Sequence, residues 1–527
     1  MRFPLSFLLT ILVDLCVGQT IWDIWQTDWN RNHLFSRLAS NSISFTTPGA
    51  IGDANIVIDP NTQYQSMDGF GATLTDSSAL ILSNLKASNS SGYWSLLSKL
   101  FDPTEGASSA ALSVIRVPLG ASDLSASAYT FDDTWNDSSL GSFTLNSAPS
   151  YLWSTLADIK SVTQYLKIIV VPWSAPAWMK TSSSLYGGSL TSGYESIFAQ
   201  YLFKSVQAMN NKGLRPYAIS CQNEPQNSDS TYPTMLLSVS QEASVGKTLR
   251  SLLDSNGFSD VKLIGYDHNW DNAGTYPVQL MQQASSAFSG VAFHCYAGEV
   301  SGQATFTRAY PNKEVYFTEC TGTVGSDWWS NIKWNMYHLF VGSTSYSART
   351  VLLWNLAAHA DGSPRLPGTD SCASGCRPVV SVDNNAWYLN EEYYLLAHSS
   401  RIVIPRDSGG PFGTRIGVTV EGTLSWTLSV QAYMTRRSSS SDQVKYGLVV
   451  INWYDNASSS WNPQPVSATI AFRGLQARYT FPVGLTTLWF YASEYGLNEE
   501  KLVVQEEVKA PSYPPRIRDA QCIMNKQ

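Results

Sequence analysis

The sequence has little charge and no basic cluster, and these absences exclude several classes of protein. Of its 527 residues only 14% are charged, and 34 basic residues against 41 acidic ones give a net charge of −7. Binding to nucleic acid or to an anionic membrane surface normally requires clustered Lys and Arg, so neither is expected. Beyond the N-terminal segment no apolar run reaches about 18 residues, which argues against a membrane span.

Metal ligands and phosphate loops are also missing. No metal-ligand spacing is found among the six histidines, which are His33, His268, His294, His338, His359 and His398. No Gly-rich phosphate-binding loop occurs either, which weighs against a doubly wound open sheet. We therefore expect no metal and no cofactor.

Cysteines are few, and their spacing limits their use. Cys372 and Cys376 are close enough to form a disulfide within one loop in an oxidising compartment. A zinc site would need a second pair at similar spacing, and the chain has none. Three further cysteines lie in apolar, strand-like runs and are expected to be buried, unreactive thiols: Cys221, Cys295 and Cys320.

The N-terminus is typical of an exported protein. One Arg precedes an apolar run over residues 3–13, and small residues follow, so residues 1–18 are interpreted as a signal peptide. Sequons begin at Asn89, Asn136 and Asn456 and are candidate glycosylation sites. We expect a secreted, monomeric protein, located outside the cell or in the cell wall.

From residue 63 to 400 short apolar strands alternate with amphipathic helices, which predicts a closed (β/α)₈ TIM barrel. Residues 194–209 place their apolar side chains on one helical face, and Gly213 supplies the stop. The eight expected strands are residues 64–70, 113–119, 167–172, 216–222, 261–266, 291–296, 314–319 and 350–355.

The pattern changes at about residue 400. Residues 401–500 alternate apolar and polar side chains between Gly-, Ser- and Asn-rich turns, which predicts a flanking antiparallel β-sandwich. Residues 19–62 are similar and are expected to join that sandwich, whereas residues 501–527 are interpreted as a poorly ordered tail. The 18 Trp and 27 Tyr residues suit stacking against sugar rings, although for any one of them core packing explains the residue equally well.

Two carboxylates follow strands at the end of the barrel where active sites form. Glu224 ends the fourth strand in Asn-Glu-Pro, and Glu319 ends the seventh. Side chains at these positions face one another across the barrel mouth. Such a pair can cleave a glycosidic bond by double displacement, with Glu319 as nucleophile and Glu224 as proton donor. Arg116, at the end of the second strand, is the candidate cation beside Glu319, or else belongs to a structural ion pair.

Short motifs in chain order resemble glycoside hydrolase family 30, whose members include glucosylceramidases and fungal endo-β-1,6-glucanases. The resemblance covers nearly the whole mature chain. It rests on DGFGATLTD (68–76), IRVPLGASD (115–123), PWSAPAW (172–178), QNEP (222–225), FHCY (293–296), TEC (318–320) and LWNL (353–356).

The resemblance implies a barrel with a β-sandwich, retention of configuration, and the two glutamates in the roles given above. It also implies a sugar subsite formed by Asp76, Trp173, Asn223, His294, Tyr296 and Trp354. Simpler explanations stay open: Trp173 and Trp354 can be packing at the barrel rim, and His294 a structural histidine. Trp178 is expected in the core.

The substrate suggested by the resemblance is a β-1,6-glucan. The segments at 267–271 and 276–280 and the loop containing Cys372 look most similar to the fungal secreted endo-β-1,6-glucanases. Within the family, a glucosylceramidase-like exo-β-glucosidase and an endo-β-1,6-galactanase or xylanase are alternatives. A non-catalytic carbohydrate-binding protein is the alternative from another class, and it would predict the loss of one of the two carboxylates.

Overall fold

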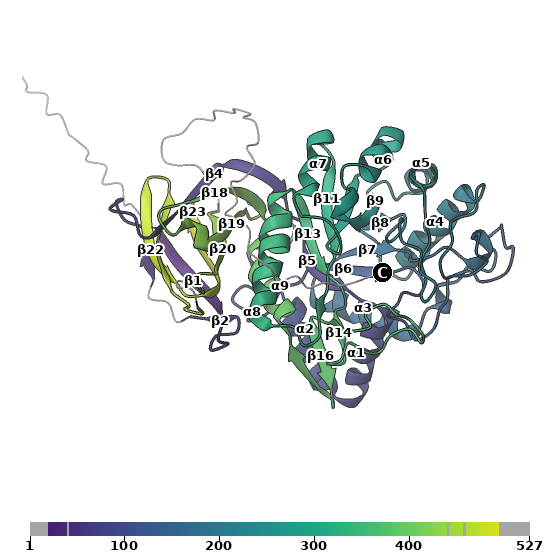
Figure 1. The fold of residues 1–527 in the computed structure, drawn as a ribbon, viewed down its shortest axis with the longest axis horizontal. Helices are drawn as coiled ribbons and strands as arrows, with labels where there is room; N and C mark the ends of the chain where they lie inside the picture. The colour runs from purple at the N-terminus through teal and green to yellow at the C-terminus, as the bar shows by residue number, and fades with distance from the viewer. Residues whose placement is uncertain (1–18, 39–41, 440–441, 457–459, 495–527) are drawn as a thin grey trace, which may run out of the picture.

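The computed structural model describes residues 19–38, 42–439, 442–456 and 460–494, and contains a closed barrel beside a β-sheet domain (Figure 1). The signal peptide expected at residues 1–18 and the tail expected at 501–527 lie outside the described residues. Within the described part of the chain, no helix is both long and apolar enough to cross a membrane.

Eight parallel strands close the barrel, as the sequence predicts. They are β5 (Gly69–Thr73), β6 (Val114–Pro118), β7 (Lys167–Val171), β8 (Ala218–Ser220), β9 (Lys262–Asn269), β10 (Gly290–His294), β11 (Glu314–Glu319) and β13 (Ala348–Leu353). Helices surround them: α1 (Asp76–Ser88), α2 (Ser90–Phe101), α3 (Ser150–Val162), α4 (Glu195–Asn211), α5 (Val239–Ser255), α6 (Tyr276–Ala284), α7 (Gly302–Ala309), α8 (Trp328–Asn335) and α9 (Glu391–Val403).

The predicted helix over 194–209 is confirmed as α4, and Gly213 follows it with a φ of 75°. The first barrel strand differs from the expectation. Residues 64–66 belong to β4 (Ala54–Ser66) of the sheet domain, so the sheet extends past the expected boundary at residue 62. Gly69 has a φ of 113°, which favours glycine and redirects the chain at the start of β5. The apolar pattern runs through this bend, so periodicity alone did not locate it.

One layer inside the barrel explains why β5 carries a second glycine. Seven strands contribute a buried side chain to a single cluster, namely Val114, Ile169, Ala218, Ile264, Ala292, Tyr316 and Leu352. Gly71 pairs with both Val114 and Leu352 and so takes the eighth place in this layer. A Cβ atom at Gly71 would lie 1.7 Å from the carbonyl oxygen of Val114, so only glycine fits there.

The second unit is one ten-stranded sheet that folds back on itself to form the two faces of a sandwich. Phe472 and Phe490 lie on strands well separated in the sheet order, yet their ring centroids are 4.9 Å apart. The main strands are β1 (Thr20–Asp28), β4, β18 (Thr414–Glu421), β19 (Leu428–Thr435), β20 (Val444–Asn452), β21 (Val466–Phe472), β22 (Leu475–Phe481) and β23 (Gly484–Ala492).

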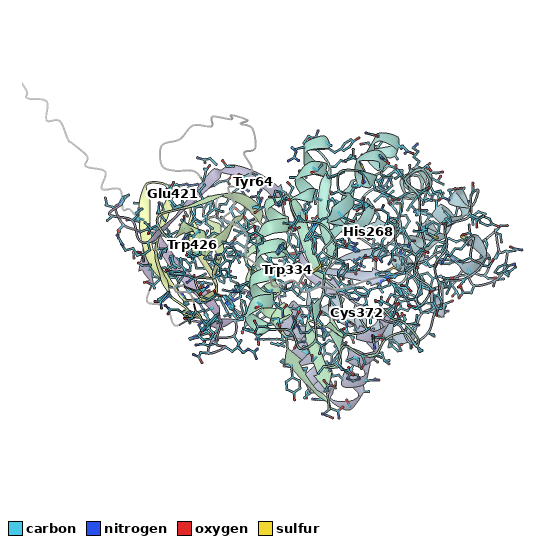
Figure 2. The ribbon with its side chains drawn as sticks, viewed as in Figure 1. Tyr64, His268, Trp334, Cys372, Glu421 and Trp426 are labelled. Atoms are coloured by element: carbon cyan, nitrogen blue, oxygen red, sulfur yellow. A yellow bond between two sulfur atoms is a disulfide. The ribbon has the colours of Figure 1, made fainter. Side chains whose placement is uncertain are left out.

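Pairing in this sheet departs from the expected all-antiparallel arrangement at one place. β4, from the N-terminal segment, runs parallel to β21 on one side and antiparallel to β18 on the other. Two-residue strands β2 (Ser36–Arg37) and β3 (Ile43–Ser44) both pair with β1. Figure 2 places Glu421 and Trp426 in this unit and His268 in the barrel.

The two units pack closely against each other through α9. His398 on this helix is fully buried, and its two ring nitrogens lie 2.8 Å from Thr487 Oγ1 and 2.9 Å from Thr27 Oγ1, both in the sheet domain. α9 also extends to residue 403, past the expected barrel boundary at 400. The two units are therefore joined by a buried, hydrogen-bonded contact.

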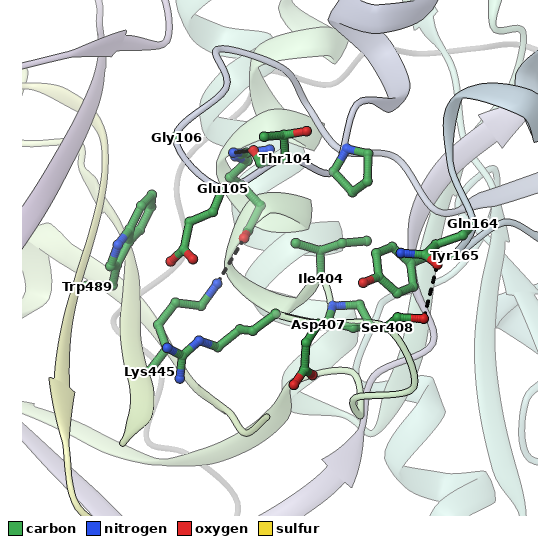
Figure 3. A pocket seen from close by; sticks show the side chains of 14 residues that line it. Thr104, Glu105, Gly106, Gln164, Tyr165, Ile404, Asp407, Ser408, Lys445 and Trp489 are labelled. Atoms are coloured by element: carbon green, nitrogen blue, oxygen red, sulfur yellow. Dashed lines mark hydrogen bonds between the residues drawn. The ribbon is translucent and has the colours of Figure 1, made fainter. Parts of the chain in front are cut away.

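A cavity of about 290 Å³ lies between the two units (Figure 3). It is lined by Gln164 and Tyr165, which precede β7, and by Lys445 and Trp489 of the sheet domain. It therefore lies at the N-terminal end of the barrel strands, opposite the end that carries Glu224 and Glu319. Short strands after β11 and β13 form two small separate sheets: β12 (Gly322–Thr323) with β15 (Cys376–Arg377), and β14 (Ala357–Ala358) with β16 (Val380–Asp383) and β17 (Ala386–Leu389).

Candidate active site

The two glutamates lie where the sequence places them, at the C-terminal ends of β8 and β11. Each is only 5% exposed. Glu224 has a φ of 45°, an unfavourable conformation for a residue with a side chain. Two backbone hydrogen bonds hold it there: Glu224 N–H donates to Asp267 O (3.0 Å), and Asn227 N–H donates to Glu224 O (2.9 Å). Such strain is typical of functional sites, where the surrounding structure fixes a side chain's direction.

Glu319 receives two hydrogen bonds on its two oxygens. Arg116 Nη1 donates to Oε2 over 2.6 Å, and the Tyr296 hydroxyl donates to Oε1 over 3.0 Å. One donor is a permanent cation, so the carboxylate charge is balanced inside the protein. Both carboxylate oxygens are therefore held in fixed positions by partners from β6 and from the segment after β10.

Arg116 organises several groups of the site at once. It is fully buried, and Nη2 donates to Asn223 Oδ1 (2.6 Å) and to Asp267 Oδ2 (3.1 Å). Its guanidinium also lies 4.9 Å from the ring centroid of Trp173. Two roles were open for Arg116 from the sequence, a partner of Glu319 or a structural ion pair, and in the structure it pairs with both Glu319 and Asp267.

Asp267 is a member of the site that sequence analysis did not propose. It accepts hydrogen bonds from Thr318 Oγ1 (2.5 Å) and from Arg116, and it lies 3.1 Å from His294 Nε2. Burial by itself would raise the pKa of Asp267, but Arg116 and His294 hold that pKa well below its ordinary value. The expected fifth strand stopped at residue 266, whereas β9 continues to Asn269 and carries Asp267 into the site.

Glu224 has different neighbours from Glu319. Asn227 Nδ2 donates to its Oε2 over 2.9 Å, and His294 Nδ1 lies 3.3 Å from its Oε1. Burial lowers the pKa of His294, but the charges of Glu319 and hydrogen bonds to Asp267 and Glu224 raise it to about 9. His294 is therefore protonated at neutral pH and bridges Glu224 and Asp267. The structure therefore places His294 in the same cluster as the two glutamates.

The fold also brings together three possible metal ligands whose spacing in the sequence did not indicate a metal site. Glu224, His268 and His294 each offer a ligand atom, and these atoms lie within 4.8 Å of one another. A metal bound there would have to displace the proton of His294, whose pKa is raised to about 9. Near neutral pH this arrangement holds a proton between carboxylates.

Asp76 and the two rim tryptophans complete the set of predicted residues. Asp76 begins α1 after β5, and its carboxylate accepts hydrogen bonds from Ser125 Oγ (2.7 Å) and the Tyr129 hydroxyl (3.0 Å). Burial raises the pKa of Asp76 to about 6. Trp173 and Trp354 stack on each other with centroids 5.2 Å apart, and they are 2% and 3% exposed.

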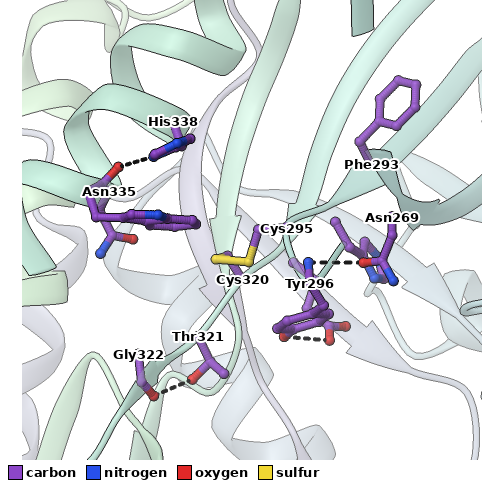
Figure 4. The surroundings of a disulfide bond; sticks show 12 residues. Asn269, Phe293, Cys295, Tyr296, Cys320, Thr321, Gly322, Asn335 and His338 are labelled. Atoms are coloured by element: carbon purple, nitrogen blue, oxygen red, sulfur yellow. Dashed lines mark hydrogen bonds between the residues drawn. A yellow bond between two sulfur atoms is a disulfide. The ribbon is translucent and has the colours of Figure 1, made fainter. Parts of the chain in front are cut away.

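A disulfide fixes the segment between β10 and β11, and this corrects one expectation. Cys295 and Cys320, expected to be free thiols, are bonded to each other, whereas Cys221 is a buried free thiol. Figure 4 shows the disulfide beside Tyr296. Cys320 is buried as expected, whereas Cys295 is only partly buried. The sequence could not reveal that these adjacent parallel strands end side by side. The bond ties the residue before Tyr296 to the residue after Glu319.

The remaining predicted sites lie outside this cluster. Cys372 and Cys376 form a second disulfide, in the loop between β14 and β15. Asn136 and Asn456 are exposed. The Asn89 side chain accepts a hydrogen bond from Gly92 N–H at the start of α2 and donates to Asn385 O (3.0 Å), so a glycan there would disturb existing contacts. Trp178 is 5% exposed and lies in the core, as expected.

Comparisons with known proteins agree with this geometry. The model of the glycosyl hydrolase family 30 TIM-barrel domain matches residues 67–403. The endo-1,6-β-D-glucanase of Neurospora crassa is 33% identical over 72% of this chain and 78% of its own length. That of Aspergillus fumigatus is 34% identical over 71% and 78%. A solved endo-β1,6-glucanase covers 90% of this chain and 99% of its own, with 26% identity and a TM-score of 0.76. The chain therefore belongs to glycoside hydrolase family 30 and is a glycosyl hydrolase.

Proposed function

We propose that the protein is a retaining endo-β-1,6-glucanase. The substrate comes from the comparisons, since two fungal endo-1,6-β-D-glucanases and a solved endo-β1,6-glucanase resemble most of this chain. Retention of the anomeric configuration is general for the family. The substrate class is a polysaccharide with accessible β-1,6 links, and the reaction is hydrolysis within the chain.

The different environments of the two glutamates carry the assignment of roles. Glu319 is held by the Arg116 cation and the Tyr296 hydroxyl, an arrangement that orients an anionic nucleophile at the anomeric carbon. Glu224 instead contacts Asn227 and the His294 ring, and the second nitrogen of that ring faces Asp267. We assign Glu224 as the group that protonates the glycosidic oxygen.

The reaction then follows two balanced steps. Glu319 attacks the anomeric carbon while Glu224 transfers its proton to the leaving oxygen, which releases the shortened chain and leaves a glycosyl ester on Glu319. Glu224, now a carboxylate, takes a proton from water, and that water cleaves the ester. The sugar leaves with its original configuration, and both glutamates return to their starting states.

The subsite residues are assigned by their chemistry. The Asp76 carboxylate can accept hydrogen bonds from sugar hydroxyls, and Asn223 lies beside Glu319's partner Arg116, where it can bond the 2-hydroxyl. Tyr296 contacts the nucleophile directly. Trp173 and Trp354 are almost fully buried and stacked on each other, so they support the wall of the subsite beside Arg116.

Secretion is part of the same proposal. An oxidising compartment suits the two disulfides, Cys295–Cys320 and Cys372–Cys376. The signal-like residues 1–18 and the exposed sequons at Asn136 and Asn456 fit export as well. A glucan of a cell wall would then be met outside the cell.

The decisive experiment incubates the purified protein with a linear β-1,6-glucan and follows the products by chromatography. A ladder of gluco-oligosaccharides whose newly released reducing ends are β by NMR supports a retaining endo-enzyme. Glu319→Gln should abolish the ladder. With an aryl β-glucoside that has a good leaving group, Glu319→Gly plus azide should give the α-glucosyl azide, whereas Glu224→Gly plus azide should give the β-glucosyl azide.

Each outcome separates a part of the proposal. Glucose as the sole product from the first time point would replace endo action by exo action. Cleavage of β-1,6-galactan or xylan but not of β-1,6-glucan would overturn the substrate. Equal activity of wild type and Glu319→Gln would remove Glu319 from the role of nucleophile.

A further inference from the structure

A groove of about 720 Å³ lies where the barrel and the sheet domain meet. We call it the tryptophan groove, defined by Trp29, Trp328, Trp329 and Trp461. Trp29 follows β1, Trp328 and Trp329 begin α8, and Trp461 lies between β20 and β21. Three separate segments of the chain thus bring four indoles to one place, which is outside the catalytic cluster.

Two of these indoles are available to a ligand. Trp461 is 51% exposed, and Trp29 is partly buried. Their ring centroids are 5.0 Å apart, with the planes inclined at 68°. Trp328 and Trp329 are buried and support the floor of the groove. Large aromatic side chains left open in a concave place are typical of binding sites, since the open indole faces remain available for contact.

The polar groups of the groove are balanced in charge. The cations are Arg31 and Lys333, and the carboxylates are Asp327 and Asp455. Asp455 Oδ2 accepts hydrogen bonds from Trp329 Nε1 and Lys333 Nζ, each over 2.6 Å, and the Arg31 guanidinium lies 4.5 Å from the Trp328 ring centroid. An uncharged ligand with apolar faces and many hydroxyl groups fits such a lining, because it needs stacking surfaces and hydrogen-bond partners but no net countercharge.

The groove lies toward the catalytic end of the barrel. Glu319 is the last residue of β11, and α8 is the next helix of the chain, so the start of α8 at Trp328 lies at the end of the barrel where the strands finish. A long polymer bound at the catalytic glutamates can therefore continue toward the groove on the same side of the molecule.

We propose that the tryptophan groove is a second, non-catalytic binding site for a glucan chain. Trp461 and Trp29 stack against glucose rings, while the charged side chains at the groove bond hydroxyl groups. This inference rests on the proposed β-1,6-glucanase function for the identity of the ligand. Its effect is to keep the enzyme on polymeric substrate between cleavage events.

The test compares Trp461→Ala with Trp94→Ala, both in the Glu319→Gln background so that no substrate is consumed. Trp94 lies on α2, is 37% exposed and serves as the matched exposed tryptophan. Asn456 lines the groove and begins a sequon, so all proteins are made in a bacterial periplasm, which forms disulfides without adding glycans. Binding to insoluble β-1,6-glucan is measured by depletion from solution.

We expect Trp461→Ala to weaken binding to the polymer by about tenfold, and Trp94→Ala to leave it unchanged. With an intact Glu319, Trp461→Ala should hydrolyse the insoluble polymer more slowly and a short soluble gluco-oligosaccharide at the wild-type rate. Unchanged polymer binding by Trp461→Ala, or an equal loss of polymer binding in both variants, would refute the proposal that the groove binds glucan.

The two proposals fail separately. If the wild type cleaves the soluble oligosaccharide but Trp461→Ala binds the polymer normally, the groove is refuted and the enzyme function stands. If the wild type leaves every β-1,6-glucan uncleaved, the proposed function is refuted. In that case a loss of polymer binding in Trp461→Ala but not in Trp94→Ala still supports the proposed binding site in the groove. If the Glu319→Gln protein does not bind the polymer at all, the proposed binding site is refuted.

Discussion

Arg116 Nη1 lies 2.6 Å from Glu319 Oε2, and both side chains are almost completely shielded from water. The same guanidinium also pairs with Asp267, so one cation serves two buried carboxylates. Because a buried charge without its partner is costly, we expect both the stability of the fold and the proposed reaction to depend on this contact.

Arg116→Met should therefore impair both properties. It leaves Glu319 and Asp267 without their cation, and we expect the free energy of unfolding to fall by about 3–5 kcal/mol. We expect kcat/KM on soluble β-1,6-glucan to fall at least about 100-fold. Denaturant unfolding and steady-state kinetics measure the two effects. Arg349→Met, which breaks ion pairs with Asp68 and Glu314 at the opposite end of the barrel, should lower stability but spare kcat/KM of the folded protein.

His294 should make stability depend on pH in the alkaline range. Its pKa is raised from 6.5 to about 9 by Glu319, Asp267 and Glu224 against the opposing effect of burial. The folded state thus binds a proton more tightly than the unfolded state, and this stabilisation is fully present below pH 6.5 and lost as pH rises through about 9. The unfolding free energy of wild type minus that of His294→Gln should fall over this interval. A difference that stays constant from pH 6 to pH 9 would contradict the prediction.

Asp76→Asn should separate stability from activity. Burial raises the pKa of Asp76 from 3.8 to about 6, so its protonated form favours folding below pH 3.8 and that contribution is lost as pH rises through about 6. Asparagine cannot ionise. Relative to the variant, wild type should lose stability between about pH 4 and pH 7, whereas kcat/KM of the variant should fall about 10- to 100-fold because an anionic acceptor for sugar hydroxyls is gone. Thermal unfolding and kinetics at pH 5 and pH 7 test both parts.

The two disulfides should contribute unequally to the free energy of unfolding and to activity. Cys295 and Cys320 are 25 residues apart, and loop-closure entropy gives about 3.5 kcal/mol of stabilisation, against about 2 kcal/mol for Cys372 and Cys376, which are 4 apart. The double variant Cys295→Ser/Cys320→Ser should also lose activity about tenfold, since the bond flanks Tyr296 and Glu319. Cys372→Ser/Cys376→Ser is the matched control. An equal loss of activity in both double variants would mean that the first bond has no special role in positioning the site.

The barrel and the positions of both glutamates follow from the sequence alone. Strand and helix periods are local properties of the chain, and in a parallel barrel all strand ends meet at one face, so a carboxylate at a strand end can be located without coordinates. Glu224, Glu319 and Arg116 were found in this way, whereas Asn223 came from the family resemblance. In the structure Arg116 donates hydrogen bonds to both Glu319 and Asn223. The resemblance of ordered motifs then supplied the family.

The contacts that cross between strands became visible in the three-dimensional structure and not before. Asp267 joins Arg116 and His294 because β9 extends past its apolar run, and Cys295 bonds Cys320 because two neighbouring strands end side by side. The tryptophan groove likewise combines segments from near residues 29, 328 and 461. Such pairings depend on the register of the strands and on the packing of the two units. Register and packing are set by the burial of apolar surface over the whole chain, and local sequence patterns do not encode them.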